Sequence, residues 1–115
     1  MPNRSVEDIL DSIIDATKDG KLSWDIEPPG RYVASLPRHR IRVWEWTNEN
    51  DDTAGATVQL LEKSGDLLDY VSADEYKPIF ADLHRLYLDA RRSAHNVAGA
   101  IAEIEEELAA LKPSR

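Results

Sequence analysis

The feature that most constrains this chain is an apolar repeat that occupies its C-terminal third. Apolar residues from Tyr76 to Leu111 follow one another at alternating intervals of four and three residues, which is a heptad pattern. A single helix over this span would be about 54 Å long at 1.5 Å per residue. A compact chain of 115 residues has a diameter of only about 35 Å. The repeat therefore predicts a long C-terminal helix that extends beyond its own globular domain.

The apolar face of this helix is wide in its first half and narrow in its second. Beside the heptad positions, the first half adds Ile79, Leu86 and Leu88, which makes the face wide enough to cover a sheet. The second half keeps a narrow apolar seam flanked by glutamates, which is typical of a coiled coil. We therefore expect a homodimer. The predicted self-association residues are Val97, Ile101, Ile104, Leu108 and Leu111.

A break near Asn96 is the alternative interpretation of the same segment. Asn96 and Gly99 are weak helix formers, and an asparagine N-cap would start a further helix. That helix would fold back within the monomer and use Ala94, Val97 and Ile101 for an intramolecular contact. Periodicity alone leaves both interpretations open.

The first 30 residues predict a short amphipathic helix and a loop. Apolar residues recur at helical spacing over Val6–Asp19, and Ser5 with Asp8 forms a capping-box pattern. Gly20 suits the C-terminal end of this helix, and Pro28-Pro29-Gly30 predicts a turn.

The spacing changes from helical to strand-like between Arg31 and Val71. Four short segments there are rich in β-branched and aromatic residues and are separated by connections of hairpin length. They predict an antiparallel meander of three or four strands. The four candidate strands are Arg31–Leu36, Arg40–Thr47, Ala54–Glu62 and Leu67–Val71.

Together these elements predict an α+β fold in a single domain over residues 1–115. Its parts are an N-terminal helix and loop (1–30), an antiparallel sheet (31–71) and a C-terminal helix or helix pair (72–112). Ser72 with Glu75 forms a second capping-box pattern, from which the C-terminal helix is expected to begin.

Composition and motifs favour a non-enzymatic protein. The chain has no cysteine, its glycines are scattered singly, and no serine lies in a strand-to-helix elbow. His84 and His95 are eleven residues apart, which is too far to hold one metal. We therefore expect no catalytic residues, no metal and no cofactor. The net charge of −8 and the absence of a long apolar run predict a cytoplasmic protein without membrane contact.

A basic and aromatic strip is the best candidate for a binding surface. Four arginines precede the first acid of this stretch, Glu45, and alternation places four of the strip's residues on one strand face. Arginine and tryptophan are enriched at interaction hot spots, which favours a protein partner in a regulatory, inhibitory or immunity-like role. The alternative is a regulatory dimer that contacts nucleic acid through the same strip. A structural role, with the tryptophans under the N-terminal helix and the arginines paired with acids, also fits. The candidate residues are Arg31, Arg38, Arg40, Arg42, Trp44 and Trp46.

Two short motifs carry a resemblance to a known group of proteins. The first is Gly20-Lys21-Leu22-Ser23-Trp24 at the end of the first helix, and the second runs from Leu86 to Ala94 and contains Ala90-Arg91-Arg92-Ser93. In this order, around a small meander, they resemble a family of small bacterial and phage-encoded proteins of uncharacterised function. The resemblance implies an α+β fold and no known catalytic residues.

Overall fold

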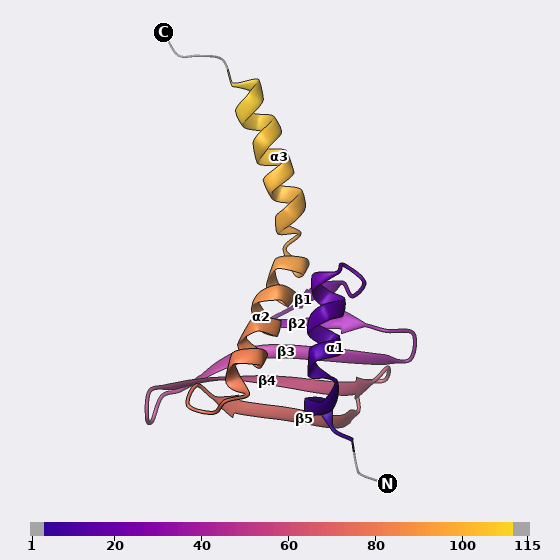
Figure 1. Ribbon diagram of the computed structural model, residues 1–115, viewed down its shortest axis with the longest axis vertical. Coiled ribbons are helices and arrows are strands. Elements are labelled where there is room, and N and C mark those ends of the chain that lie inside the picture. Colours follow the sequence, from indigo (N-terminus) through magenta and orange to yellow (C-terminus); the bar gives the residue numbers. More distant parts are fainter. Residues whose placement is uncertain (1–3, 112–115) are drawn as a thin grey trace.

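A computed structural model describes residues 4–111 and confirms the α+β class (Figure 1). Helix α1 (Val6–Lys18) comes first, and helices α2 (Phe80–Ala94) and α3 (Val97–Ala110) come last. The predicted C-terminal segment 72–112 ends at a residue outside the described range. Between the helices lie β1 (Trp24–Glu27), β2 (Arg31–Ser35), β3 (His39–Asn48), β4 (Thr53–Glu62) and β5 (Leu67–Asp74).

The strands form one antiparallel sheet in the order β1-β2-β3-β4-β5, so every strand pairs with its neighbour along the chain. The predicted meander is therefore present, but the predicted count of three or four strands is wrong. The missed strand is β1, which is only four residues long and pairs Trp24 with Ala34 and Glu27 with Arg31. Its residues, Trp24-Asp25-Ile26-Glu27, do alternate between apolar and polar, but four residues are too few to identify a strand, and pairing with β2 decides their conformation.

Helices α1 and α2 lie side by side on one face of the sheet, where they bury the core (Figure 1). Leu10 of α1 and Leu83 of α2 meet Val43 and Val58 of the central strands in this core, and all four are at most 2% exposed. The opposite face of the sheet carries no described helix, and we call it the open face.

The N-terminal helix follows its sequence signals closely. The backbone N–H of Ser5 donates to the Asp8 carboxylate at 2.7 Å, as the capping-box pattern predicts. Gly20 follows the helix with a φ of +75°, a left-handed conformation that glycine adopts without strain. Trp24 then folds back over α1, where its Nε1 donates to Thr17 Oγ1 at 3.0 Å.

The start of the C-terminal helix differs from the prediction. Ser72 and Glu75 do not cap a helix, because β5 continues to Asp74 and α2 begins at Phe80. The Ser72 hydroxyl instead lies 2.7 Å from that of Thr57 on β4, and the Glu75 carboxylate accepts from the Ala54 backbone N–H. Pairing with the neighbouring strand thus overrides a local helix signal.

The long C-terminal helix is divided in two at Asn96, so the prediction of one continuous helix is wrong. Asn96 has a left-handed backbone (φ 48°, ψ 51°), and its side chain lies against Gly99. A Cβ at Gly99 would come within 2.3 Å of Asn96 Nδ2, so any larger residue at 99 would displace the Asn96 side chain. The break belongs to the alternative interpretation, but the predicted fold-back is also wrong.

Helix α3 projects away from the domain instead (Figure 1). Among the described elements it contacts α2 alone, and none of residues 97–110 is buried. The described molecule is accordingly elongated, with a longest dimension of 69 Å.

Candidate interaction surfaces

The open face of the sheet holds most of the predicted basic and aromatic strip. Because side chains alternate along a strand, Arg40, Arg42, Trp44 and Trp46 of β3 point away from the face that carries Ile41 and Val43. Arg31 joins them from β2, where it pairs directly with Trp44. The tryptophans therefore do not lie under α1, and that part of the structural interpretation is wrong.

Two of the arginines are held by neighbours on this face. The Arg31 guanidinium lies 4.7 Å from the centroid of the Trp44 ring, which is a cation–π contact. Arg42 Nε lies 2.6 Å from Glu27 Oε1, and Arg42 Nη1 donates to Gln59 Oε1 at 3.1 Å. Arg42 Nη2 also donates to Glu27 Oε2 at 3.2 Å, so Arg42 is both neutralised and oriented. The predicted pairing of arginines with acids is thus present at Arg42.

Trp46 is held flat against the sheet by a glycine on the neighbouring strand. Gly55 pairs with Trp46, and a Cβ at Gly55 would come within 2.1 Å of the indole ring. The indole Nε1 donates to Thr57 Oγ1 at 3.0 Å, and this hydroxyl also contacts Ser72. The ring is therefore a fixed, half-buried aromatic surface.

Arg38 is the one strip residue that the structure separates from the others. It lies in the exposed connection between β2 and β3. Within residues 4–111, Arg38 and Arg40 form no ion pair, and they are the strip's remaining unneutralised cations apart from the stacked Arg31. The open face therefore combines one free cation, Arg40, with ordered aromatic rings, and Arg38 lies in the connection beside it.

The predicted strip did not include three further open-face residues, namely Glu27, Gln59 and Tyr70. Glu27 was not expected because β1 itself was missed. Gln59 alternates with Val58 and Leu60 of β4, and this alternation placed it opposite the apolar face without marking it as a binding residue. Tyr70 pairs with Gln59 and is 59% exposed.

Helix α3 presents the second candidate surface. The predicted self-association residues lie along one side of this helix and form what we call the α3 seam. Its large side chains remain in water: Ile101 is 47%, Ile104 51% and Leu108 62% exposed. The other two members of the seam are Val97 and Leu111.

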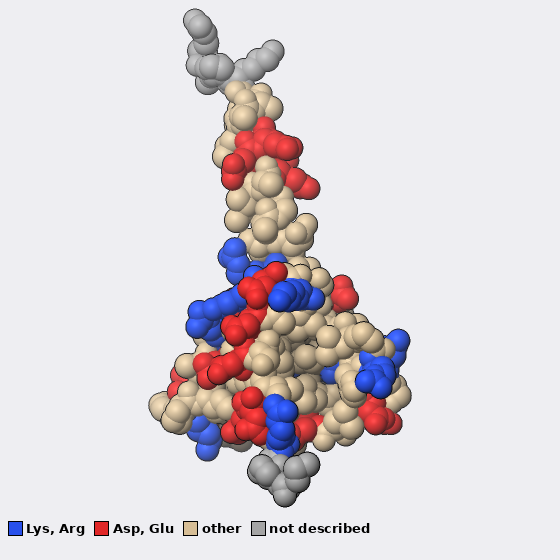
Figure 2. Space-filling model, turned by 45° about the vertical axis from the view of Figure 1, so that its right-hand side comes forward, with Lys and Arg blue, Asp and Glu red and all other residues tan. Residues whose placement is uncertain are grey.

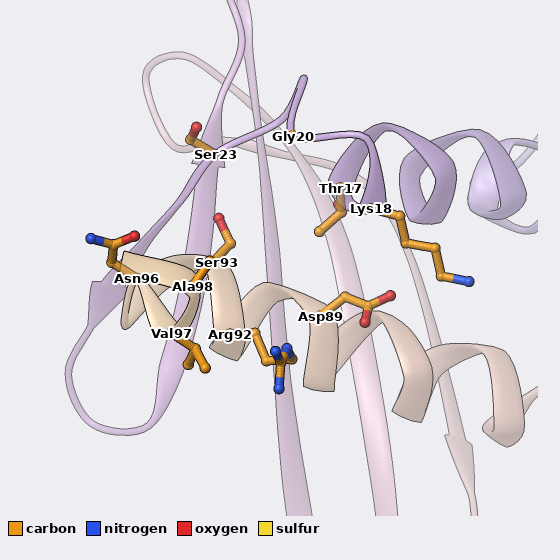
Figure 3. Close-up of a pocket in the computed structure, with 10 residues that line it drawn as sticks. All are labelled: Thr17, Lys18, Gly20, Ser23, Asp89, Arg92, Ser93, Asn96, Val97 and Ala98. Carbon is orange, nitrogen blue, oxygen red and sulfur yellow. The ribbon is translucent and has the colours of Figure 1, made fainter. Parts of the chain in front are cut away.

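A hollow of about 520 Å³ lies where the end of α1 meets the junction of α2 and α3 (Figure 3). Lys18 and Arg92 line it together with Asp89, whose Oδ2 is buried without a hydrogen-bond partner in the described chain. Ser93 also lines it, and its hydroxyl accepts from the Trp24 backbone N–H at 3.1 Å. The lining holds one carboxylate and no histidine.

The histidines and acids form no metal centre in residues 4–111. His84 contacts the Glu45 carboxylate and stacks on Phe80, with ring centroids 5.5 Å apart. His95 Nε2 lies 3.3 Å from the Tyr32 hydroxyl. These two rings are thus engaged in separate contacts that join α2 and the residue after it to the sheet.

Comparison of the chain with protein-family models, with curated proteins and with solved structures finds no match. In the part of the chain that the structure describes, no helix combines the length and the apolar character that a membrane span requires.

Proposed function

We propose that this chain is a non-enzymatic interaction module, in which the α3 seam joins two copies and the open face binds a protein partner. The observation that carries the proposal is the exposure of the seam on a helix that contacts α2 and no other element within residues 4–111. Soluble proteins rarely leave a contiguous row of large apolar side chains in water unless it serves an interaction.

The energetics of an isolated helix support self-association. Helix α3 has 14 residues, and helices shorter than about 12–15 residues are marginal in water without packing. Burying one leucine or isoleucine side chain contributes about 1.5–3 kcal/mol. If a second copy packs its seam against this one, all the seam side chains become buried together. Their spacing is the one that a coiled coil uses.

The chemistry of the open face favours a protein over a nucleic acid. Arg42 is neutralised by Glu27, and Arg31 is stacked on Trp44. A nucleic-acid surface gains its affinity from cations that neutralise phosphates, and this face has few to offer. Ordered tryptophan and arginine side chains are instead typical of the anchors of protein interfaces. A module of this kind acts by binding, which fits a regulatory, inhibitory or immunity-like role.

The mass of the protein in solution tests self-association. Replacing Ile101→Asp together with Ile104→Asp places two charges in the seam, and we expect a dimeric mass by sedimentation to fall to that of a folded monomer. Ala102→Asp with Ala109→Asp adds the same charge outside the seam and is expected to leave the dimer intact. A wild-type chain that sediments as a monomer at every concentration would contradict the proposal.

Titration with a random-sequence DNA duplex tests the nucleic-acid alternative. We expect no binding at physiological salt, and no effect of Arg40→Glu with Arg42→Glu. Salt-sensitive binding that this double variant abolishes would favour the nucleic-acid role. The protein-binding role is tested by affinity capture from the source cell, in which Trp44→Ala is expected to lose a protein that the wild type retains.

A further inference from the structure

Charge is distributed unevenly along the two C-terminal helices. The outer part of α3 is acidic, with Glu103, Glu105, Glu106 and Glu107 and no basic residue in its last turn. The end of α2 is basic, with Arg91 and Arg92 in its last turn. Figure 2 shows the acidic side chains gathered on the projecting helix and lysine and arginine side chains gathered near its base.

An apolar groove opens at this basic end. It has a volume of about 490 Å³, and Leu88 and Val97 supply its apolar floor. Arg91, Arg92 and His95 surround them, and Leu88 is 41% exposed. Val97 belongs both to this groove and to the α3 seam. The groove is therefore the inner end of the seam rather than a separate surface.

The two ends of this continuous surface are complementary to each other. The outer end offers apolar side chains flanked by glutamates, and the inner end offers an apolar groove flanked by arginines. They cannot meet within one chain, because α3 leads away from α2 and does not fold back (Figure 1). A second copy of the chain supplies each end with its complement.

We propose that two copies associate antiparallel, with the acidic outer end of each α3 seated on the basic groove of its partner. This inference rests on the self-association proposed above and adds its direction and its inner contact surface. The twofold axis of this pair passes near the start of α3. The outer end of α3 in each copy therefore fills the groove of the other copy in an identical way. Leu108 and Leu111 then approach Leu88 of the partner copy, and Glu105 and Glu107, which flank the seam, approach the partner's basic residues, Arg91 and Arg92.

A parallel pair is disfavoured by the same charges. It would place the glutamates of one α3 beside those of the other, and the Arg91-Arg92 pairs beside each other. Glu105 and Glu107 flank the seam positions Ile104 and Leu108, where like charges on a partner helix oppose association. The antiparallel pair replaces these repulsions by attractions at both ends.

Cross-linking between single-cysteine variants tests the direction, because the natural chain has no cysteine. Leu88→Cys and Leu111→Cys each place one thiol at an exposed position at opposite ends of the surface. A short bismaleimide is expected to join the two variants when they are mixed and to leave each variant alone uncross-linked. Cross-linking of Leu111→Cys to itself indicates a parallel pair and overturns the inference.

Charge reversal gives an independent measure. Arg91→Glu with Arg92→Glu is expected to raise the dimer dissociation constant at least about tenfold, because four attractions in the pair become repulsions. Adding Glu105→Lys and Glu107→Lys to the same chain is expected to restore the dissociation constant. The matched control, Arg38→Glu with Lys63→Glu, makes the same charge change in two strand connections and is expected to leave the constant unchanged.

The results separate this inference from the proposal beneath it. A monomeric wild-type chain means that self-association itself fails, and the inference falls with it. A dimeric chain whose dissociation constant is insensitive to Arg91→Glu with Arg92→Glu retains the proposed function and overturns only the antiparallel arrangement. Circular dichroism on every variant confirms that the domain remains folded.

Discussion

Helices α2 and α3 carry one continuous heptad pattern but have opposite environments. In α2 the side chains of Leu83, Leu86 and Ala90 are fully buried against the sheet and α1. In α3 the corresponding side chains remain in water, and Leu108 is 62% exposed. An apolar period therefore shows which side of a helix needs a partner, and it does not show whether that partner belongs to the same chain.

The residues beside the heptad positions explain the difference between the two helices. Beside these positions α2 adds Leu86, which widens its apolar face and is fully buried in the core. Helix α3 has alanines and glutamates at its flanking positions, so its apolar face stays narrow. A wide face covers a sheet, whereas a narrow one fits another helix.

The largest expected effect comes from Leu86→Ala in α2. Leu86 is 0% exposed, so its removal leaves a cavity between the helix and the sheet. We expect the free energy of unfolding to fall by about 2–5 kcal/mol. Guanidinium denaturation followed by tryptophan fluorescence measures this loss, because Trp24 lies in the same core. A loss under about 1 kcal/mol would mean that α2 is not packed as described.

A smaller effect is expected at Asn96, where the two helices separate. A left-handed backbone conformation destabilises a residue that carries a Cβ by roughly 1–2 kcal/mol. Asparagine tolerates this conformation better than alanine does. Asn96→Ala is therefore expected to shift the junction toward a continuous helix by a factor of about 5–30. Asn96→Gly keeps the left-handed conformation accessible and is expected to keep the break.

The distance between spin labels on α2 and α3 measures this shift. The labels are attached to one chain at Arg85→Cys and Glu106→Cys, and the labelled protein is mixed with an excess of unlabelled protein. The measured distance then lies within one molecule and reports the angle between α2 and α3. We expect a longer distance in Asn96→Ala than in Asn96→Gly. Equal distances in the two variants would show that packing against α2, and not the backbone of residue 96, produces the break.

Local signals predicted the elements that they control and failed where another strand intervenes. The capping box at Ser5 and the glycine after α1 are local, and both are present in the structure. The same pattern at Ser72 did not start a helix, because this residue pairs with Thr57 on β4. The pairing of Ser72 with a distant strand cannot be inferred from the four residues of the capping-box pattern alone.

The candidate surfaces were predictable to different degrees for the same reason. Alternation along β3 placed Arg40, Arg42, Trp44 and Trp46 on one face, because a strand has a strict period of two. It did not predict that Glu27 neutralises Arg42, since that contact requires β1 at the sheet edge. The α3 seam was found from its period, whereas the break at Asn96 that directs it outward depends on one left-handed residue.

The smallest expected effect on folding comes from Leu108→Ala in α3, which matches Leu86→Ala in chemistry and differs in burial. Leu108 is already 62% exposed, and alanine is the better helix former, so the two losses nearly cancel. At a dilution where the chain is monomeric, we expect the free energy of unfolding to change by less than about 0.5 kcal/mol.

At high concentration the dimer of the same Leu108→Ala variant is expected to dissociate more readily, because each copy loses apolar area from the seam. A loss above about 1 kcal/mol in the dilute monomer would show that α3 packs on its own domain. The difference between α2 and α3 would then be one of degree.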